Sequence, residues 1–237
     1  MQIFYTPDIT VGATHYMLSE EESKHAIRVL RLQPNDTLQL VDGRGGFYTA
    51  RIIDPHPKKT LLVIESSQQE YGKRNHYLHI AVAPTKNLDR LEWFLEKATE
   101  IGIDEISLIQ CQRSERKEAK TERLEKIITS AVKQSIKAYH PQLNSLQPLS
   151  RIVTQFHEGH KFIAHCLPGE DKVSLASQLQ LQGSCLILIG PEGDFTEKEI
   201  AEALQNGFKP ITLGDSRLRT ETAALEACFE VNFLNRA

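Results

Sequence analysis

The sequence predicts a two-domain protein: a small β-barrel over residues 1–70 and an α/β domain with a parallel sheet over residues 71–237. Three observations predict this fold. The first part of the chain contains short β-like runs around a single helix. A polar stretch, SSQQEYGKRNH (66–76), is typical of a linker. Beyond it, apolar strand-like runs alternate with helical patterns, which indicates βαβ units.

The first domain is expected to consist of strands joined by turns. Its strands are DTLQLV (36–41), FYTARII (47–53) and TLLVIES (60–66), the first two joined by the glycine-rich turn DGRGG. One helix, SEEESKHAIRVLRL (19–32), begins at Ser19, because Ser19 and Glu22 have the spacing of a capping box. Short strands that close around one helix indicate a small barrel.

The second domain is expected to alternate strands with helices. The strands are YLHIAVAP (77–84), EISLIQ (105–110), KFIAHCL (161–167), CLILIG (185–190) and PITLG (210–214). Helices are expected over residues 89–102, ending at Gly102, and from about residue 122 to Tyr139, before Pro141.

Composition and charge exclude several classes of function. The net charge of −3 argues against nucleic-acid binding by bulk charge alone. The longest wholly apolar run, Cys185–Ile189, is far shorter than the ~20 residues of a membrane helix. The N-terminus has no basic region followed by an apolar block, so we expect no signal peptide. Four widely spaced cysteines without a C-x-x-C motif indicate reduced thiols and a cytoplasmic protein.

The most informative motif is IGPEGDFTEKEI (189–200), in which a strand runs into a Gly-rich turn and then into a helix capped by Thr196 and Glu199. Such a turn often binds phosphate. Here it carries Glu192 and Asp194, which would repel a di- or triphosphate, and no Gly-Lys-Ser/Thr follows. We therefore expect a cofactor with hydroxyl groups and a positive centre, which describes S-adenosylmethionine.

A second motif, PITLGDSRLRTETAALEACFEV (210–231), places Arg219 at the start of a helix that begins near Thr220. A cation is locally unfavourable there, because the free N–H groups of a helix N-terminus already carry partial positive charge. Arg219 is therefore either a ligand-binding residue or the partner of Glu221 or Asp215 in a salt bridge.

No metal site is predicted, although H-x-x-H occurs at residues 76–79 and 157–160. In a strand, residues three apart point to opposite faces, so the first pair is poorly placed to bind a metal. The second pair lies just before His165 and Cys166, and no metal is predicted there either.

Together these motifs resemble those of the RsmE family, SPOUT-class methyltransferases that modify a uridine of 16S ribosomal RNA. IGPEGDFTEKEI and LGDSRLRTETAALEA (213–227) are similar to the family's C-terminal signature pair. EKATEIGIDEI, QCQRSE and AVKQSIKAYHPQL resemble its middle motifs, and HAIRVLRLQPNDTLQLVDGRG resembles its N-terminal motif. In AVKQS, Lys133 stands where the family usually has Glu.

The resemblance implies a PUA-like RNA-binding β-barrel over residues 1–70 and a SPOUT-like methyltransferase domain with a deep trefoil knot over residues 71–237. It implies a homodimer with S-adenosylmethionine held in the knot. By carry-over, three loops bind this cofactor: His165 to Pro168, Ile189 to Gly193, and Leu213 to Thr222. The residues assigned to it are His165, Cys166, Leu167, Pro168, Ile189, Gly190, Pro191, Glu192, Gly193, Leu213, Gly214, Leu218, Arg219, Thr220 and Thr222.

The C-terminal helix also favours a homodimer. Its apolar residues cover more than one narrow stripe, so it is expected to pack on its own sheet and on a partner. These residues are Ala224, Leu225, Cys228, Phe229, Val231 and Leu234.

The implied reaction methylates N3 of a uridine in 16S rRNA of the small ribosomal subunit. Because a weakly acidic proton is lost, donors that stabilise negative charge on the base are favourable. Arg219 is the candidate for that role or for binding a nearby phosphate, and Glu192 or Glu221 is the candidate proton acceptor. Phosphate contacts position RNA, and the candidates for them are Arg28 and Arg31 on the N-terminal helix and Arg113 and Arg116 in the middle loop.

Two other functions remain open at this point. One is a PUA-like RNA-binding protein whose knotted domain holds a ligand but does not catalyse. The other is a nucleotide-dependent enzyme, which the acidic turn disfavours.

Overall fold

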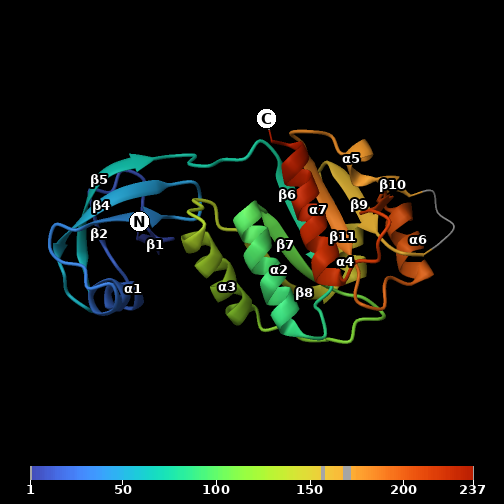
Figure 1. Ribbon diagram of the computed structural model, residues 1–237, viewed down its shortest axis with the longest axis horizontal. Coiled ribbons are helices and arrows are strands. Elements are labelled where there is room, and N and C mark those ends of the chain that lie inside the picture. The colour runs from blue at the N-terminus through green and yellow to red at the C-terminus, as the bar shows by residue number, and fades with distance from the viewer. Residues whose placement is uncertain (1, 156–157, 168–171, 237) are drawn as a thin grey trace. The chain divides into compact units, whose positions relative to one another are not determined.

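The computed structural model describes residues 2–155, 158–167 and 172–236, which form two compact units (Figure 1). One unit consists of Met1–Lys73 with Thr129–His140, and the other of Arg74–Ile128 with Pro141–Ala237. Residues 129–140, which a division at residue 70 assigns to the second domain, thus cluster with the first unit.

The first unit is built on a five-stranded sheet in the order β1-β3-β4-β5-β2. Its strands are β1 (Ile3–Tyr5), β2 (His15–Met17), β3 (Thr37–Val41), β4 (Phe47–Asp54) and β5 (Leu61–Gln68). β1 pairs with β3 in parallel, and the other pairs are antiparallel. Alternation along β4 buries Tyr48, Ala50 and Ile52 in the core of this unit, as the period of a half-buried strand requires.

The N-terminal helix is shorter than the sequence predicts. α1 (Glu20–Lys24) is capped by Ser19, whose Oγ accepts a hydrogen bond from Glu22 N–H at 3.2 Å. It continues only as one π-helical turn, η1 (His25–Val29). Arg31 then adopts φ 57°, a left-handed conformation that no right-handed helix can include. The prediction that Arg31 lies on this helix is wrong, whereas Arg28 lies within η1.

The middle helix also ends early. α3 (Thr121–Gln134) stops well before Tyr139, because Ile136 adopts φ 57° and Lys137 N–H bonds to Val132 O at 3.0 Å. The predicted continuation to Tyr139 is therefore wrong. Lys133, near the end of α3, forms an ion pair at 2.9 Å with Glu22, so its ammonium has a structural role within the first unit.

The second unit contains a seven-stranded, wholly parallel sheet in the order β10-β12-β9-β11-β6-β7-β8 (Figure 1). Its strands are β6 (Tyr77–Val82), β7 (Glu105–Gln110), β8 (Gln142–Pro148), β9 (His160–Ala164), β10 (Val173–Ser174), β11 (Ser184–Ile189) and β12 (Lys209–Thr212). All the strands predicted for this region are present. β8 and β10 were not predicted, because their residues are mostly polar or the strand is very short.

Helices cover both faces of this sheet. α2 (Leu88–Ile101) packs with α7 (Thr220–Leu234), and α7 contacts β6 and β11. α4 (Leu149–Thr154) and α6 (Glu197–Gln205) share an apolar core with the opposite face, and the short α5 (Leu175–Gln178) contacts α7. Two predicted helix ends are confirmed. Thr196 and Glu199 form a complete capping box, and Gly102, at φ 129°, ends α2.

Because all strands of the second unit run the same way, the loops after β6, β7, β9, β11 and β12 lie along one edge of the sheet. Open parallel sheets bind ligands at this carboxyl edge. No helix among the described residues is long and apolar enough to cross a membrane.

Candidate functional site

A cavity of about 320 Å³ lies at the carboxyl edge of the sheet, between the loops after β9, β11 and β12 and the first turn of α7. The described residues that line it are Ala164, His165, Cys166, Ile189, Gly190, Pro191, Glu192, Asp194, Ile211, Thr212, Leu213, Gly214, Ser216, Arg217, Leu218, Arg219, Thr220 and Ala223. Cavities that bind small molecules usually measure ~300–1,000 Å³. The volume is therefore sufficient for a compact ligand.

The cavity brings together most of the residues predicted to bind the cofactor. Leu167, Gly193 and Thr222 are predicted but do not line it, and Pro168 lies outside the described residues. The lining residues outside the three predicted loops are Ala164, Asp194, Ile211, Thr212 and Ala223, while Ser216 and Arg217 lie within the predicted loop from Leu213 to Thr222. Ala164, Ile211 and Thr212 lie at the ends of β9 and β12, where the strand ends were the available signal, and Asp194 and Ala223 each directly follow a predicted residue.

Two glycines shape the cavity in different ways. A Cβ on Gly190 would lie 3.1 Å from the Phe195 ring, closer than an ordinary contact, so a side chain there would have to displace this buried ring. Thr220 Oγ1 donates to Gly190 O at 3.0 Å and ties the first turn of α7 to this turn. Gly214 has φ 111°, and a Cβ at this position would meet no atom within 4 Å, so its backbone borders open space.

The two carboxylates of the Gly-rich turn hold neighbouring loops. Glu192 Oε1 accepts a hydrogen bond from Lys86 N–H, in the loop after β6, at 2.9 Å. Asp194 Oδ2 accepts one from Cys166 N–H, in the loop after β9, at 2.8 Å. The acidic residues that argue against a phosphate ligand are therefore also parts of the scaffold.

The two middle-loop arginines likewise contact backbone. Arg113 Nη1 donates to Gly193 O at 2.9 Å and to Phe195 O at 3.4 Å. Arg116 donates through Nε to Thr85 O at 3.2 Å and through Nη2 to Lys86 O at 2.7 Å. Both guanidinium groups thus brace loops at the carboxyl edge of the sheet, a role that their sequence positions did not indicate.

Arg219 occupies the N-cap position of α7 and is exposed at the cavity. Its side chain forms no hydrogen bond or ion pair with the described part of the chain. The salt bridge considered for it with Glu221 is not formed, because Glu221 Oε1 lies 3.7 Å from Arg90 Nε instead. Glu221 is buried, and its Oε2 has no hydrogen-bond partner among the described residues. The Arg219 cation is therefore available to a ligand.

The thiols near the site differ in exposure. Cys166 is exposed at the cavity, and its backbone is held by Asp194. Cys111, in the loop after β7, is buried. Burial raises the pKa of its thiol well above the usual value, and the nearby carboxylates of Glu199 and Asp194 raise it further. Cys111 is thus a neutral packing residue at neutral pH rather than a nucleophile.

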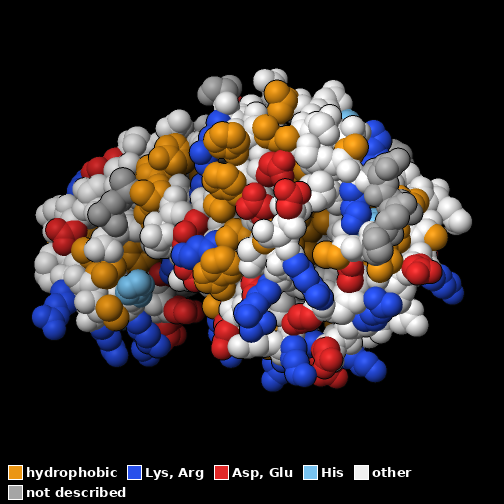
Figure 2. Space-filling model, turned by 45° about the vertical axis from the view of Figure 1, so that its right-hand side comes forward, with side chains coloured by type: hydrophobic (Ala, Val, Ile, Leu, Met, Phe, Trp, Pro, Cys, Tyr) orange, Lys and Arg blue, Asp and Glu red, His pale blue; other side chains and the backbone are white. Residues whose placement is uncertain are grey.

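The remaining predicted RNA-binding residues, Arg28 and Arg31, lie in the first unit and are both exposed. Arg28 lines a surface hollow together with Lys24 and His25 and with the acidic residues Glu20 and Glu21. On the face drawn in Figure 2, basic and acidic side chains are interspersed, in keeping with the small net charge of −3. Any RNA contact must therefore depend on local groups of basic residues.

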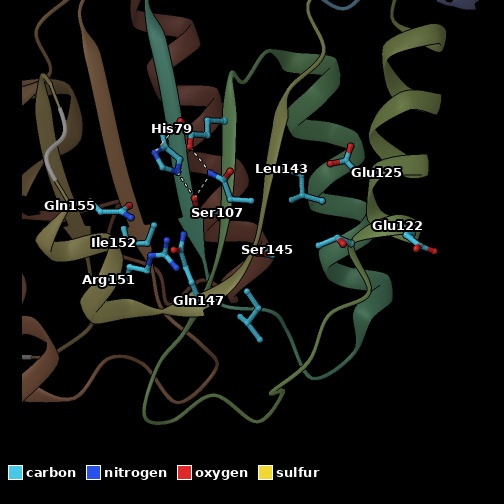
Figure 3. A pocket seen from close by; sticks show the side chains of 14 residues that line it. His79, Ser107, Glu122, Glu125, Leu143, Ser145, Gln147, Arg151, Ile152 and Gln155 are labelled. Carbon is cyan, nitrogen blue, oxygen red and sulfur yellow. Dashed lines mark hydrogen bonds and ion pairs between the residues drawn. The ribbon is translucent and has the colours of Figure 1, made fainter. Parts of the chain in front are cut away.

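A second, larger cavity of about 690 Å³ lies beside the edge strand β8 (Figure 3). A polar network forms part of its floor: His79 Nε2 lies 2.8 Å from Ser107 Oγ, and Asn144 Nδ2 donates to Ser107 Oγ at 2.9 Å and to Glu105 Oε1 at 2.5 Å. His79 Nδ1 lies 3.7 Å from Glu105 Oε2, so the order Ser–His–Glu resembles that of a hydrolase triad.

This network is not a hydrolytic site. Ser107 is fully buried, so its hydroxyl cannot reach a substrate carbonyl, and His79 is only 4% exposed. Glu105 Oε2 also accepts the Tyr77 hydroxyl at 2.6 Å, which makes the cluster a satisfied polar network within the sheet. The smaller cavity, at the carboxyl edge, is the better candidate. Among the described residues, no group of three or more His, Cys, Asp or Glu is placed to hold a metal ion.

Two family models match this chain. One, described as "RNA methyltransferase domain", matches residues 73–231, and another, described as "RNA methyltransferase PUA domain", matches residues 18–66. The chain belongs to the RNA methyltransferase family. The first match covers the unit with the parallel sheet and the cavity, and the second covers an N-terminal PUA domain. The family resemblance seen in the sequence is therefore confirmed.

Individual members of this RNA methyltransferase family are similar over nearly the whole chain. Ribosomal RNA small subunit methyltransferase E of Synechocystis sp. is 28% identical over 97% of this chain and 73% of its own length. A solved structure described as a "probable rRNA-methyltransferase" from Porphyromonas gingivalis is 39% identical, has a TM-score of 0.91, and matches over 99% of this chain and 98% of that one. Ribosomal RNA small subunit methyltransferase E of Neisseria gonorrhoeae, solved bound to S-adenosyl methionine, is 26% identical with a TM-score of 0.89, over 99% of this chain and 98% of that one.

Proposed function

We propose that this RNA methyltransferase transfers a methyl group from S-adenosylmethionine to N3 of a uridine in 16S rRNA of the small ribosomal subunit. The observation that carries the proposal is the cavity at the carboxyl edge of the sheet, lined by the loops that correspond to the family's C-terminal signature pair. The names of the similar proteins, and the cofactor bound in one of them, support both the substrate and the cofactor.

The residues present fit this cofactor. Gly214 leaves open space beside its backbone, and Gly190 lets the neighbouring turn fold tightly. Arg217 offers a cation to the amino-acid carboxylate, while the carboxylates of Glu192 and Asp194 disfavour a phosphate-containing ligand. When bound, the cofactor supplies an electrophilic methyl group on a sulfonium centre.

The chain's own residues then have three tasks. The three loops orient the cofactor mainly by backbone groups. Arg219, exposed at the N-terminus of α7, stabilises the negative charge that develops on the uracil ring, or holds an adjacent phosphate. Glu221 or Glu192 accepts the N3 proton. Glu221 is buried next to Arg90 and does not itself line the cavity, whereas Glu192 lines it.

RNA is bound by both units in this proposal. Residues 1–70 form the PUA-like RNA-binding domain, with Arg28 and Arg31 contacting phosphates, and residues 71–237 form the SPOUT-like methyltransferase domain. Arg113 and Arg116 belong to the expected set of phosphate contacts, although their guanidinium groups also brace backbone. We place the reaction in the cytoplasm, where ribosomal subunits are.

We further propose that the methyltransferase domain contains a deep trefoil knot and that the protein is a homodimer. Two large apolar side chains of α7 support the dimer: Phe229 is 41% exposed and Phe233 is 55% exposed. Their rings stack with centroids 5.8 Å apart, and Arg236 lies over both. Exposed aromatic residues flanked by Arg are typical of protein interfaces.

Mass spectrometry of 16S rRNA from cells with and without the gene tests the function. We expect one uridine to lose a single methyl group when the gene is absent and to regain it when purified protein and S-adenosylmethionine are added to the deficient subunits. A protein that binds cofactor and subunits but transfers no methyl group would instead be a non-catalytic RNA-binding protein.

A further inference from the structure

Three loops at the carboxyl edge of the sheet are joined in a closed ring of side-chain-to-backbone hydrogen bonds. The loop after β6 is bound to the turn after β11, because Lys86 N–H donates to Glu192 Oε1 at 2.9 Å. The loop after β7 is bound to the same turn, because Arg113 Nη1 donates to Gly193 O at 2.9 Å. The ring is closed by Arg116, whose Nη2 donates to Lys86 O at 2.7 Å.

The ring of hydrogen bonds stabilises the conformation of the Gly-rich turn. Backbone groups in a loop have no strand partners, so side chains or water must satisfy them. Of the turn's residues from Pro191 to Phe195, Pro191 and Phe195 are buried, whereas Glu192 and Gly193 are exposed. Gly193 is packed directly against Arg113, since a Cβ there would lie 3.1 Å from the Arg113 Cβ. The shape of the turn therefore depends in part on residues outside it.

We infer that Glu192 and Arg113 are positioning residues: they hold the turn from Gly190 to Phe195 in the shape that accepts the cofactor. Glu192 acts by accepting a hydrogen bond from Lys86 N–H, not by taking the N3 proton of the uridine. Arg113 acts by donating hydrogen bonds to the carbonyls of Gly193 and Phe195, not by contacting a phosphate. The inference rests on the proposed function, and it leaves Glu221 as the candidate proton acceptor.

Glu192 is tested by two substitutions that separate the two roles. Gln keeps an oxygen that accepts from Lys86 N–H but is no base, whereas Ala removes both properties. We expect Glu192→Ala to weaken S-adenosylmethionine binding about five- to tenfold in calorimetry without RNA, the size of one hydrogen bond. Glu192→Gln should recover most of that affinity and keep kcat within about tenfold of the wild type. Glu197→Ala, an exposed carboxylate on α6, is the matched control.

A fall in kcat on the order of 10²-fold or more in Glu192→Gln, with cofactor affinity unchanged, would overturn the inference, because it would identify Glu192 as the proton acceptor.

Arg113 is tested by comparing Lys with Ala. A Lys keeps the charge that a phosphate contact needs, but its single ammonium cannot reproduce the guanidinium contacts to Gly193 O and Phe195 O. We expect both variants to weaken cofactor binding in the absence of RNA and to leave the salt dependence of RNA binding unchanged. Lys117→Ala is the control, since Lys117 is an exposed basic residue of the same segment. If Arg113 instead contacts a phosphate, both variants should bind the cofactor normally, and Arg113→Lys should bind RNA normally. Arg113→Ala should then show a flatter log–log dependence of RNA affinity on salt concentration.

A measurement without cofactor separates this inference from the proposed function. In the cofactor-free protein, hydrogen exchange at the Lys86 amide should accelerate in Glu192→Ala and remain near the wild-type rate in Glu192→Gln. If this pattern holds but the wild-type protein binds no S-adenosylmethionine, the proposed function fails and the positioning role stands. Equal exchange rates in all three proteins would show that Glu192 does not hold the loop and would overturn the inference.

Discussion

Asp194 Oδ2 accepts a hydrogen bond from Cys166 N–H at 2.8 Å, and this contact joins the loop after β9 to the Gly-rich turn after β11. Asp194 adopts φ 60°, a left-handed conformation that Asp and Asn tolerate better than other side chains. Its backbone N–H bonds to Pro191 O at 2.9 Å, which closes the turn. One residue thus shapes the turn and attaches it to the loop after β9, the neighbouring strand.

Asp194→Ala should therefore weaken S-adenosylmethionine binding more than Asp194→Asn. Ala loses the acceptor and is strained at positive φ by about 1 kcal/mol, whereas Asn keeps an acceptor oxygen and tolerates this conformation. Calorimetry should give a dissociation constant raised on the order of tenfold or more for Ala and only a few-fold for Asn. If the Ala variant bound the cofactor as tightly as the wild type, the contact would have no part in shaping the cavity.

The two cavity glycines should respond to Val in different ways. Gly190→Val places atoms against the Phe195 ring, 3.1 Å from the Cβ position, so we expect loss of cofactor binding together with a lower melting temperature. Gly214→Val meets no neighbour but must adopt φ 111°, and its side chain would project into open space at the cavity. Calorimetry measures the affinity of each variant for the cofactor, and thermal unfolding measures its melting temperature. Undiminished affinity in both variants would remove these loops from the cofactor site.

Much of the second unit could be predicted because its signals are local. β7 begins at Glu105 and ends at Gln110, as its apolar run predicts, and the capping box at Thr196 starts α6 where its spacing indicates. The sequence carries no comparable local signal for a helix that ends because one residue changes its backbone conformation. Ile136 adopts φ 57°, a conformation that β-branched residues rarely adopt, so nothing in its side chain indicated the end of α3, and the helix was predicted too long.

The sequence predicted where the candidate site lies in the fold, but it did not predict which residues contact one another there. Strand ends followed by Gly predict a carboxyl-edge site, and most of the residues named from the motifs line the cavity. The roles of Glu192 and Arg113 depend on loops 106 and 80 positions away along the chain. The strand order β9-β11-β6-β7 brings these loops together, and no local pattern encodes that order.

The proposed dimer depends on exposed aromatic residues of α7. Replacing Phe229 and Phe233 together by Asp should give a monomer, because burying two carboxylates at an interface is unfavourable. Light scattering at micromolar concentration measures the mass directly. Val11→Asp, at a position 71% exposed in the first unit, is the control and should remain dimeric. A monomeric wild-type protein would rule out the dimer itself.

The N-terminal arginines should act on RNA affinity alone. Arg28→Ala with Arg31→Ala removes two exposed cations of the first unit, and each lost phosphate contact should flatten the log–log salt slope of RNA binding by about 0.7–0.9. Cofactor affinity should not change, because neither residue lines the cavity. Filter binding over a range of salt concentrations measures the slope. An unchanged slope would show that these residues do not contact phosphates.

Arg219 should behave differently from Arg28 and Arg31, because it is exposed at the cavity and occupies the N-cap of α7. If it stabilises negative charge on the uracil ring, Arg219→Ala should lower the methylation rate at saturating RNA on the order of 10²–10³-fold, as loss of an oxyanion-hole donor does. Steady-state kinetics on methyl-deficient small subunits separates this effect from binding. Arg219→Lys keeps the charge but not the planar donors, so partial recovery would point to charge as the main contribution. A variant that only requires more RNA, with its maximal rate intact, would make Arg219 a phosphate contact, and the catalytic assignment would be wrong.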